Sequence, residues 1–141
     1  MKKQFEQYLN DIKRNYHVAD SQLLKDEVLS DDSRVYYHAT SIENKDSILK
    51  NGFLFEKADE SLSKIYFAKN IVAFPRPLET EYIVLLVDLS SIDYIDENNS
   101  AGDVSVVGDI SPEVIFGWIV IGKVIEDNNG TRRVVYDKNQ G

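Results

Sequence analysis

The sequence predicts an α+β protein with a mostly antiparallel sheet. Three observations indicate this class: helical periodicity occurs early in the chain, extended apolar runs occur late, and Asn128-Asn129-Gly130 has the composition of a tight hairpin turn between two such runs. Segregated helices and strands are typical of α+β folds, whereas alternating ones build parallel sheets. The length of 141 residues suits one domain.

Residues 2–16 carry an apolar stripe at helical spacing, which predicts an amphipathic helix. The stripe consists of Phe5, Tyr8, Leu9, Ile12 and Tyr16. A second, shorter helix is predicted over residues 21–29, because Ser21 can serve as its N-cap and leucine and valine side chains supply an apolar face. Residues 1–33 are therefore expected to be an N-terminal helical segment that precedes the main domain.

The pattern changes to that of a strand over residues 34–39. Thr40 and Glu43 then have the spacing of a capping box, in which two side chains satisfy free N–H groups at the start of a helix. That helix is predicted to end near Lys50, because Gly52 tolerates the left-handed backbone of a helix C-terminus.

Short strands are predicted over residues 53–55 and 64–68, on either side of a polar loop over residues 56–63. A brief helical segment should follow and end at Pro75 and Pro77. Residues 81–88 lack polar alternation, which predicts a strand buried on both faces, and a polar loop follows over residues 90–102. The remaining predicted elements are a strand over 104–107, a helical turn starting at Ser111-Pro112-Glu113, and hairpin strands over 116–125 and 131–136.

The composition excludes several classes of protein. The absence of cysteine excludes a disulfide framework, a thiolate zinc site and a cysteine nucleophile. The 24 acidic residues exceed the 16 basic ones, and the net charge of −8 argues against a long basic track for duplex nucleic acid. No apolar run approaches the roughly 20 residues of a membrane span, and the N-terminal residues lack the apolar core of a secretory signal. We therefore expect a cytoplasmic protein with no membrane partner.

Common catalytic motifs are absent from the sequence. It contains no Gly-rich phosphate loop, no GxGxxG, no HExxH and no GxSxG. The two histidines, His17 and His38, are 21 positions apart and make a poor metal set. We therefore expect no metal site.

Four short segments, in this order, resemble the ADP-ribosyltransferase superfamily, on the branch of poly(ADP-ribose) polymerases and diphtheria-toxin-like enzymes. They are Tyr37-His38-Ala39-Thr40, a helix ending Ile48-Leu49-Lys50-Asn51-Gly52-Phe53, Ile65-Tyr66-Phe67-Ala68, and the stretch from Gly102-Asp103 to Pro112-Glu113-Val114-Ile115. The resemblance spans residues 34 to 125. It implies two split antiparallel sheets around an NAD crevice, formed by a domain over residues 34–141.

The resemblance also implies a cofactor-binding set on two strands. His38 and Thr40 would hydrogen-bond a ribose hydroxyl of NAD, and Tyr66 would stack on the nicotinamide ring, a use that suits a flat, amphipathic side chain. Ala39 stands where the family has a glycine whose backbone pairs with the nicotinamide amide. Phe67 and Ala68 complete the set. Each residue also has a structural interpretation: His38 as a core histidine, Thr40 as a helix cap and Tyr66 as an ordinary strand tyrosine.

The resemblance implies a carboxylate at the start of the late strand. Asp103 occupies this position, where the family commonly has glutamate, and aspartate is one methylene shorter. Such an acid would stabilise the oxocarbenium-like transition state and orient the acceptor. Glu113 is the second candidate, although an acid in the first turn of a helix also interacts favourably with the helix dipole.

The function implied is mono-ADP-ribosyl transfer from NAD to a protein acceptor, as in a bacterial toxin or a phage effector. A non-catalytic module that binds a nucleotide or a protein on the same fold is the alternative, supported by the missing glutamate. A tRNA 2′-phosphotransferase-like enzyme is a third hypothesis. The absence of a third histidine and the net charge of −8 argue against it.

Overall fold

The computed structural model describes residues 4–25, 32–54, 64–70, 80–93, 95–97 and 102–138. Its α-helices are α1 (Phe5–Lys13) and α2 (Lys45–Asn51), and short 3₁₀ helices cover Asp32–Arg34, Ile42–Asn44 and Pro112–Val114. Its strands are β1 (Val18–Leu23), β2 (Val35–Ser41), β3 (Ile65–Phe67), β4 (Tyr82–Asp88), β5 (Asp96–Glu97), β6 (Val104–Val106), β7 (Ile115–Ile121), β8 (Lys123–Glu126) and β9 (Arg132–Val135).

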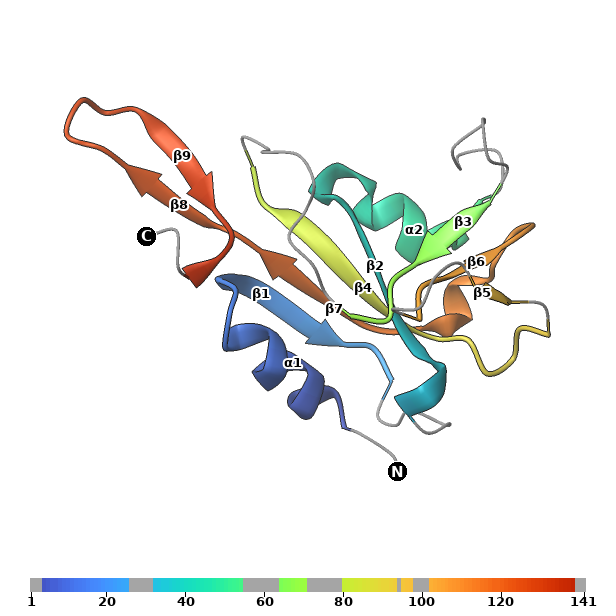
Figure 1. Ribbon diagram of the computed structural model, residues 1–141. Helices are drawn as coiled ribbons and strands as arrows, with labels where there is room; N and C mark the ends of the chain where they lie inside the picture. The colour runs from blue at the N-terminus through green and yellow to red at the C-terminus, as the bar shows by residue number, and fades with distance from the viewer. Residues whose placement is uncertain are drawn as a thin grey trace.

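The strands form three sheets, and every pair of neighbouring strands is antiparallel. The main sheet has the order β1-β7-β4-β2, a smaller one has the order β3-β6-β5, and β8 and β9 form a hairpin that projects from the body (Figure 1). A bridge between Tyr37 and Ala68 links the main sheet to the smaller one. The α+β class with mostly antiparallel sheets is therefore confirmed.

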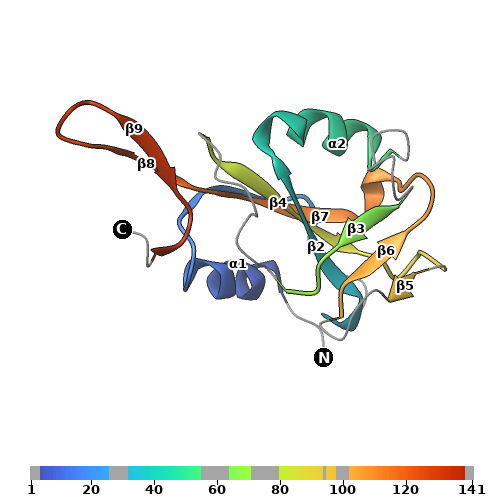
Figure 2. The same ribbon diagram turned by 45° about the horizontal axis from the view of Figure 1, so that its top comes forward.

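The two faces of the main sheet bury two separate cores. Residues of β4 alternate between them: Ile83, Leu85 and Val87 face one core, while Tyr82, Val84 and Leu86 face the other. Helix α1 covers the second face, and α2 and the smaller sheet lie on the first (Figure 2). Because both faces of β4 are covered, its sequence needs no polar alternation, as predicted.

Several predicted elements are confirmed. In α1 the apolar stripe is buried, and α2 ends at Gly52 with a φ of 78°. The strands β2, β3, β4 and β6 lie where the sequence predicts them, Ser111-Pro112-Glu113 begins a 3₁₀ turn, and the β8–β9 hairpin turns at Asn128–Gly130. The predicted loop at 56–63 and the segment before Pro75 and Pro77 lie outside the described residues.

The predicted helix at residues 21–29 is wrong where the structure describes it. Val18–Leu23 is strand β1, in which Ser21 pairs with Ile119 of β7. Residues 26–29 lie outside the described part of the chain. Backbone pairing along the edge of β7 overrides the weak local preference of this segment for a helix.

The predicted capping box is also wrong. Thr40 still belongs to β2, opposite Ile83, and its Oγ1 accepts a hydrogen bond of 2.9 Å from Asn44 Nδ2. The following 3₁₀ turn starts after Ser41 without a side-chain cap. The helix thus begins later than the local spacing suggests, because the strand continues through Ser41.

Three smaller differences concern strand ends. Phe53 forms only an isolated bridge with Ile110, and Phe55 lies outside the described residues. The predicted loop at 90–102 contains the two-residue strand β5. The predicted strand over 116–125 is divided into β7 and β8 at Gly122, whose φ is 143°.

Candidate functional site

A pocket of about 290 Å³ lies between β2, the start of β3 and helix α2. Its lining includes His38 and Thr40 from β2, Ser47 from α2, and Lys64 and Tyr66 from the β3 segment. We call it the His38–Tyr66 pocket. The structure thus brings His38 and Tyr66, which the sequence places on two separate strands, to one pocket. Strand alternation explains why both His38 and Thr40 line the pocket, since residues two apart on β2 project from the same face.

The imidazole of His38 is held in a defined orientation. Its Nδ1 lies 2.8 Å from the carbonyl oxygen of Tyr66, and its ring packs against Phe53 and Phe67 with centroid distances of 4.9 and 5.5 Å. A carbonyl oxygen can only accept, so Nδ1 must carry the hydrogen in this contact. In the neutral ring Nε2 then has the lone pair, and it can accept a hydrogen bond from a ligand hydroxyl.

Burial lowers the pKa of His38, and the hydrogen bond to the Tyr66 carbonyl opposes that shift. A folded pKa below the unfolded value of about 6.5 means that the folded state binds fewer protons. We therefore expect the free energy of unfolding to fall as the pH drops below about 6.5. Urea melts at several pH values should show this loss in the wild type. The His38→Gln variant should show a smaller slope, and an equal slope in the two proteins would contradict the assignment.

The other members of the predicted cofactor-binding set do not line this pocket. Ala39 lies between His38 and Thr40 on β2, so its side chain projects from the opposite face. Phe67 is buried in the core beneath His38. Ala68 exchanges backbone hydrogen bonds of 2.8 Å with Tyr37 and so joins the two sheets. These residues hold the pocket together and do not contribute side chains to it.

The side chain of Tyr66 is available for stacking. It is 39% exposed, although its neighbours Ile65 and Phe67 are buried. Tyr66 pairs with Ser105 of β6, so the two side chains project from the same face of the smaller sheet. An exposed aromatic ring at the rim of a pocket presents a flat apolar face to a ligand.

Asp103 lies outside the lining of the pocket. It comes just before β6, and its Oδ1 accepts a hydrogen bond of 3.0 Å from the backbone N–H of Lys69. The pairing of β3 with β6 ends at Phe67 and Val104, so Asp103 lies one residue beyond it.

Glu113 also lies outside the pocket, in the 3₁₀ turn before β7. Its backbone N–H donates to Ser111 Oγ at 3.3 Å, and its carbonyl accepts from the Lys25 ammonium group. Its side chain is exposed. Among the described lining residues of the His38–Tyr66 pocket there is no carboxylate.

Ser105 is a residue that the sequence analysis did not single out. It is fully buried, and it pairs with Tyr66 on one side and with Asp96 on the other. A serine within Val104-Ser105-Val106 looks like any strand residue in the sequence. Only the pairing of β3, β6 and β5 shows that Tyr66, Ser105 and Asp96 form one row across the smaller sheet. Asp96 ends the row on β5, 3.8 Å from the ammonium group of Lys64.

Comparison with models of protein families, with curated proteins and with solved structures finds no match to this chain. Within the described residues, no cluster of three or more His, Asp or Glu side chains is arranged to hold a metal ion. None of the helices described is long and apolar enough to cross a membrane.

Proposed function

We propose that the His38–Tyr66 pocket binds the nicotinamide–ribose half of NAD and that the chain transfers ADP-ribose to a protein acceptor. The observation that carries the proposal is the convergence of His38, Thr40 and Tyr66 on one pocket of about 290 Å³. Ligand pockets commonly measure about 300–1,000 Å³, so this one suits half of a dinucleotide. The split-sheet crevice implied by the family resemblance agrees with this arrangement.

Each side chain has a defined role in the proposed complex. The lone pair on His38 Nε2 accepts a ribose hydroxyl hydrogen, and the Tyr66 ring stacks on nicotinamide. In the reaction the bond between nicotinamide and ribose C1′ breaks, and its electron pair leaves with nicotinamide. A nucleophile of the acceptor forms the new bond to C1′ and loses its proton. A carboxylate near C1′ would stabilise the positive charge that develops there.

A second candidate is a nucleotide-binding module without transferase activity. The position of Asp103 favours it, because the carboxylate bonds the Lys69 N–H and does not line the pocket. Binding of NAD is common to both candidates. Release of nicotinamide separates them.

Tyr66→Ala tests the binding step. NAD should raise the melting temperature of the wild type, because a ligand that binds only the folded state stabilises it. Loss of an aromatic stacking partner costs about 1–3 kcal/mol, so the variant should bind NAD roughly tenfold or more weakly. Calorimetric titration and thermal melts measure both effects.

Tyr66→Phe is the matched control, since it keeps the ring and removes only the hydroxyl. Its affinity for NAD should stay close to that of the wild type. Equal affinities for the wild type and Tyr66→Ala would show that NAD binds elsewhere, and absence of binding to the wild type would refute both candidates.

A further inference from the structure

A second, larger pocket lies at the base of the β8–β9 hairpin. It measures about 490 Å³, and its lining includes Lys13, His17, Lys123 and Lys138, with Glu81 at the start of β4. We call it the basic pocket. It shares no lining residue with the His38–Tyr66 pocket. It lies next to β1, whereas the first pocket lies next to β2, at the other edge of the main sheet.

Backbone hydrogen bonds fix the three chain segments that build the basic pocket. The His17 carbonyl accepts from Gly122 N–H, the His17 N–H donates to the Tyr136 carbonyl, and the Lys138 N–H donates to the Asn15 carbonyl, each at 2.8 Å. The end of α1, the junction of β7 with β8 and the segment after β9 thus meet here. The lysines are attached to a rigid backbone frame, although their side chains are long.

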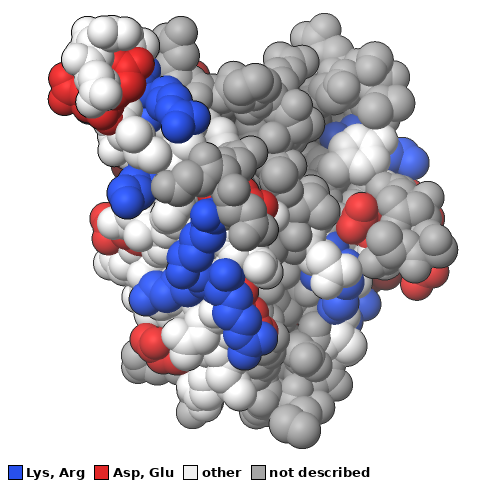
Figure 3. Space-filling model, turned by 60° about the vertical axis from the view of Figure 1, so that its left-hand side comes forward, with Lys and Arg blue, Asp and Glu red and all other residues white. Residues whose placement is uncertain are grey.

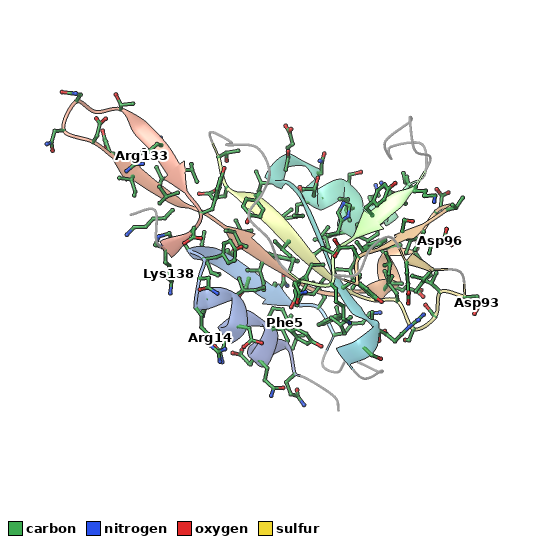
Figure 4. The ribbon with its side chains drawn as sticks, viewed as in Figure 1. Phe5, Arg14, Asp93, Asp96, Arg133 and Lys138 are labelled. Atoms are coloured by element: carbon green, nitrogen blue, oxygen red, sulfur yellow. The ribbon has the colours of Figure 1, made fainter. Side chains whose placement is uncertain are left out.

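The charge of the basic pocket is opposite to that of the chain. The chain carries a net charge of −8, yet three ammonium groups line this pocket against the carboxylate of Glu81, with the Asp137 carboxylate close enough to add to the rise that burial causes in the pKa of the lining residue Tyr16. Figure 3 looks onto this face, where basic side chains gather near the base of the hairpin. In Figure 4, Lys138 and Arg14 lie at this end of the molecule, while Asp93 and Asp96 lie at the opposite end.

The lysine side chains of the basic pocket lack partners among the described residues. No ion pair or side-chain hydrogen bond joins Lys13, Lys123 or Lys138 to any other described residue. The Nε2 atom of His17 is buried and has no hydrogen-bond partner there. By contrast, Arg14, which is outside the pocket, pairs with Asp11 at 3.3 Å.

We propose that the basic pocket binds the phosphate group of a small ligand. A phosphate dianion carries the charge opposite to that of the three ammonium groups, and its oxygens can accept hydrogen bonds from several of them at once. A single carboxylate carries half that charge and fewer acceptors. The proposal does not depend on NAD binding at the His38–Tyr66 pocket.

The chain has only two histidines, so imidazole NMR spectra report on each pocket separately. Titration with inorganic pyrophosphate should shift the His17 resonances in a saturable way and leave those of His38 unchanged. Titration with inorganic phosphate tests whether one phosphate group is sufficient. Sodium chloride at the same ionic strength controls for screening. Absence of a saturable His17 shift with both probes would overturn the proposal.

Lys123→Gln should weaken pyrophosphate binding roughly tenfold, because a charge-assisted hydrogen bond is lost. Arg14→Gln is the matched control, since it removes the same charge on the same surface outside the pocket, and its affinity should be unchanged. Equal weakening in the two variants would mean a diffuse charge effect and would overturn the proposal. NAD, as a third probe, should shift His38. If it does not, while pyrophosphate shifts His17, only the NAD proposal fails.

Discussion

Gly52→Ala should destabilise the protein by about 2–5 kcal/mol. Gly52 has a φ of 78° and a ψ of −160°, a conformation confined almost entirely to glycine, which costs an L-residue with a side chain about 1–3 kcal/mol. An added Cβ would also overlap the carbonyl oxygen of Ile110 and approach the nitrogen of Pro112 to 2.8 Å. These backbone atoms cannot move aside, because Phe53 and Ile110 exchange two hydrogen bonds of 2.9 Å. Urea unfolding followed by circular dichroism measures the loss.

Gly130→Ala is the control for this prediction. Gly130 has the same φ of 78°, but its nearest neighbour to an added Cβ is a flexible Glu126 oxygen at 3.8 Å. Only the conformational cost of about 1–2 kcal/mol should remain. The two variants differ in the steric overlap at Gly52 and in its ψ of −160°, and equal destabilisation would contradict the close approach of Ile110. Because Gly52 lines the His38–Tyr66 pocket, its variant should also bind NAD more weakly.

Asp103→Asn should lower the rate of nicotinamide release by about 10²–10³ if Asp103 stabilises the charge on ribose. The affinity for NAD should hardly change, because the interaction belongs mainly to the transition state. The substitution is well suited to this site: the asparagine oxygen can still accept the N–H of Lys69, so the structural hydrogen bond is retained while the charge is lost. Single-turnover kinetics with labelled NAD measures the rate.

Two further variants complete this experiment. Asp103→Glu restores the longer acid of the resembling family and should retain or raise activity. Glu113→Gln should leave the rate unchanged, because Glu113 lies outside the pocket on an exposed turn. If Asp103→Asn turns over NAD as fast as the wild type, Asp103 is a structural residue. If neither the wild type nor any variant releases nicotinamide, the protein is the nucleotide-binding module without transferase activity.

The site was predictable in part. The positions of His38 and Tyr66 followed from short motifs on two strands, and the structure brings both side chains to one pocket. The position of the Asp103 side chain relative to that pocket was not predictable, because it depends on which group donates a hydrogen bond to the carboxylate. The donor is the backbone N–H of Lys69, which is 34 positions away in the sequence.

The basic pocket had no signature in the sequence. Lys13 is more than a hundred positions from Lys123 and Lys138 in the sequence, and in a chain with a net charge of −8 each looks like an ordinary surface lysine. Pairing of His17 with Gly122 and of Asn15 with Lys138 brings them together. Clusters of this kind form only when the sheet is assembled.

The sequence by itself determined the elements whose signals are local and strong: the apolar stripe of α1, the glycine at the end of α2, the buried run of β4 and the turn of the β8–β9 hairpin. Tertiary structure alone decided that Val18–Leu23 is a strand, since the free edge of β7 supplies its hydrogen-bond partners. It also decided that Thr40 stays in β2 and does not cap a helix, because Thr40 pairs with Ile83. The physical reason is the same in each case: local propensities amount to a few tenths of a kcal/mol per residue, and pairing with a distant strand outweighs them.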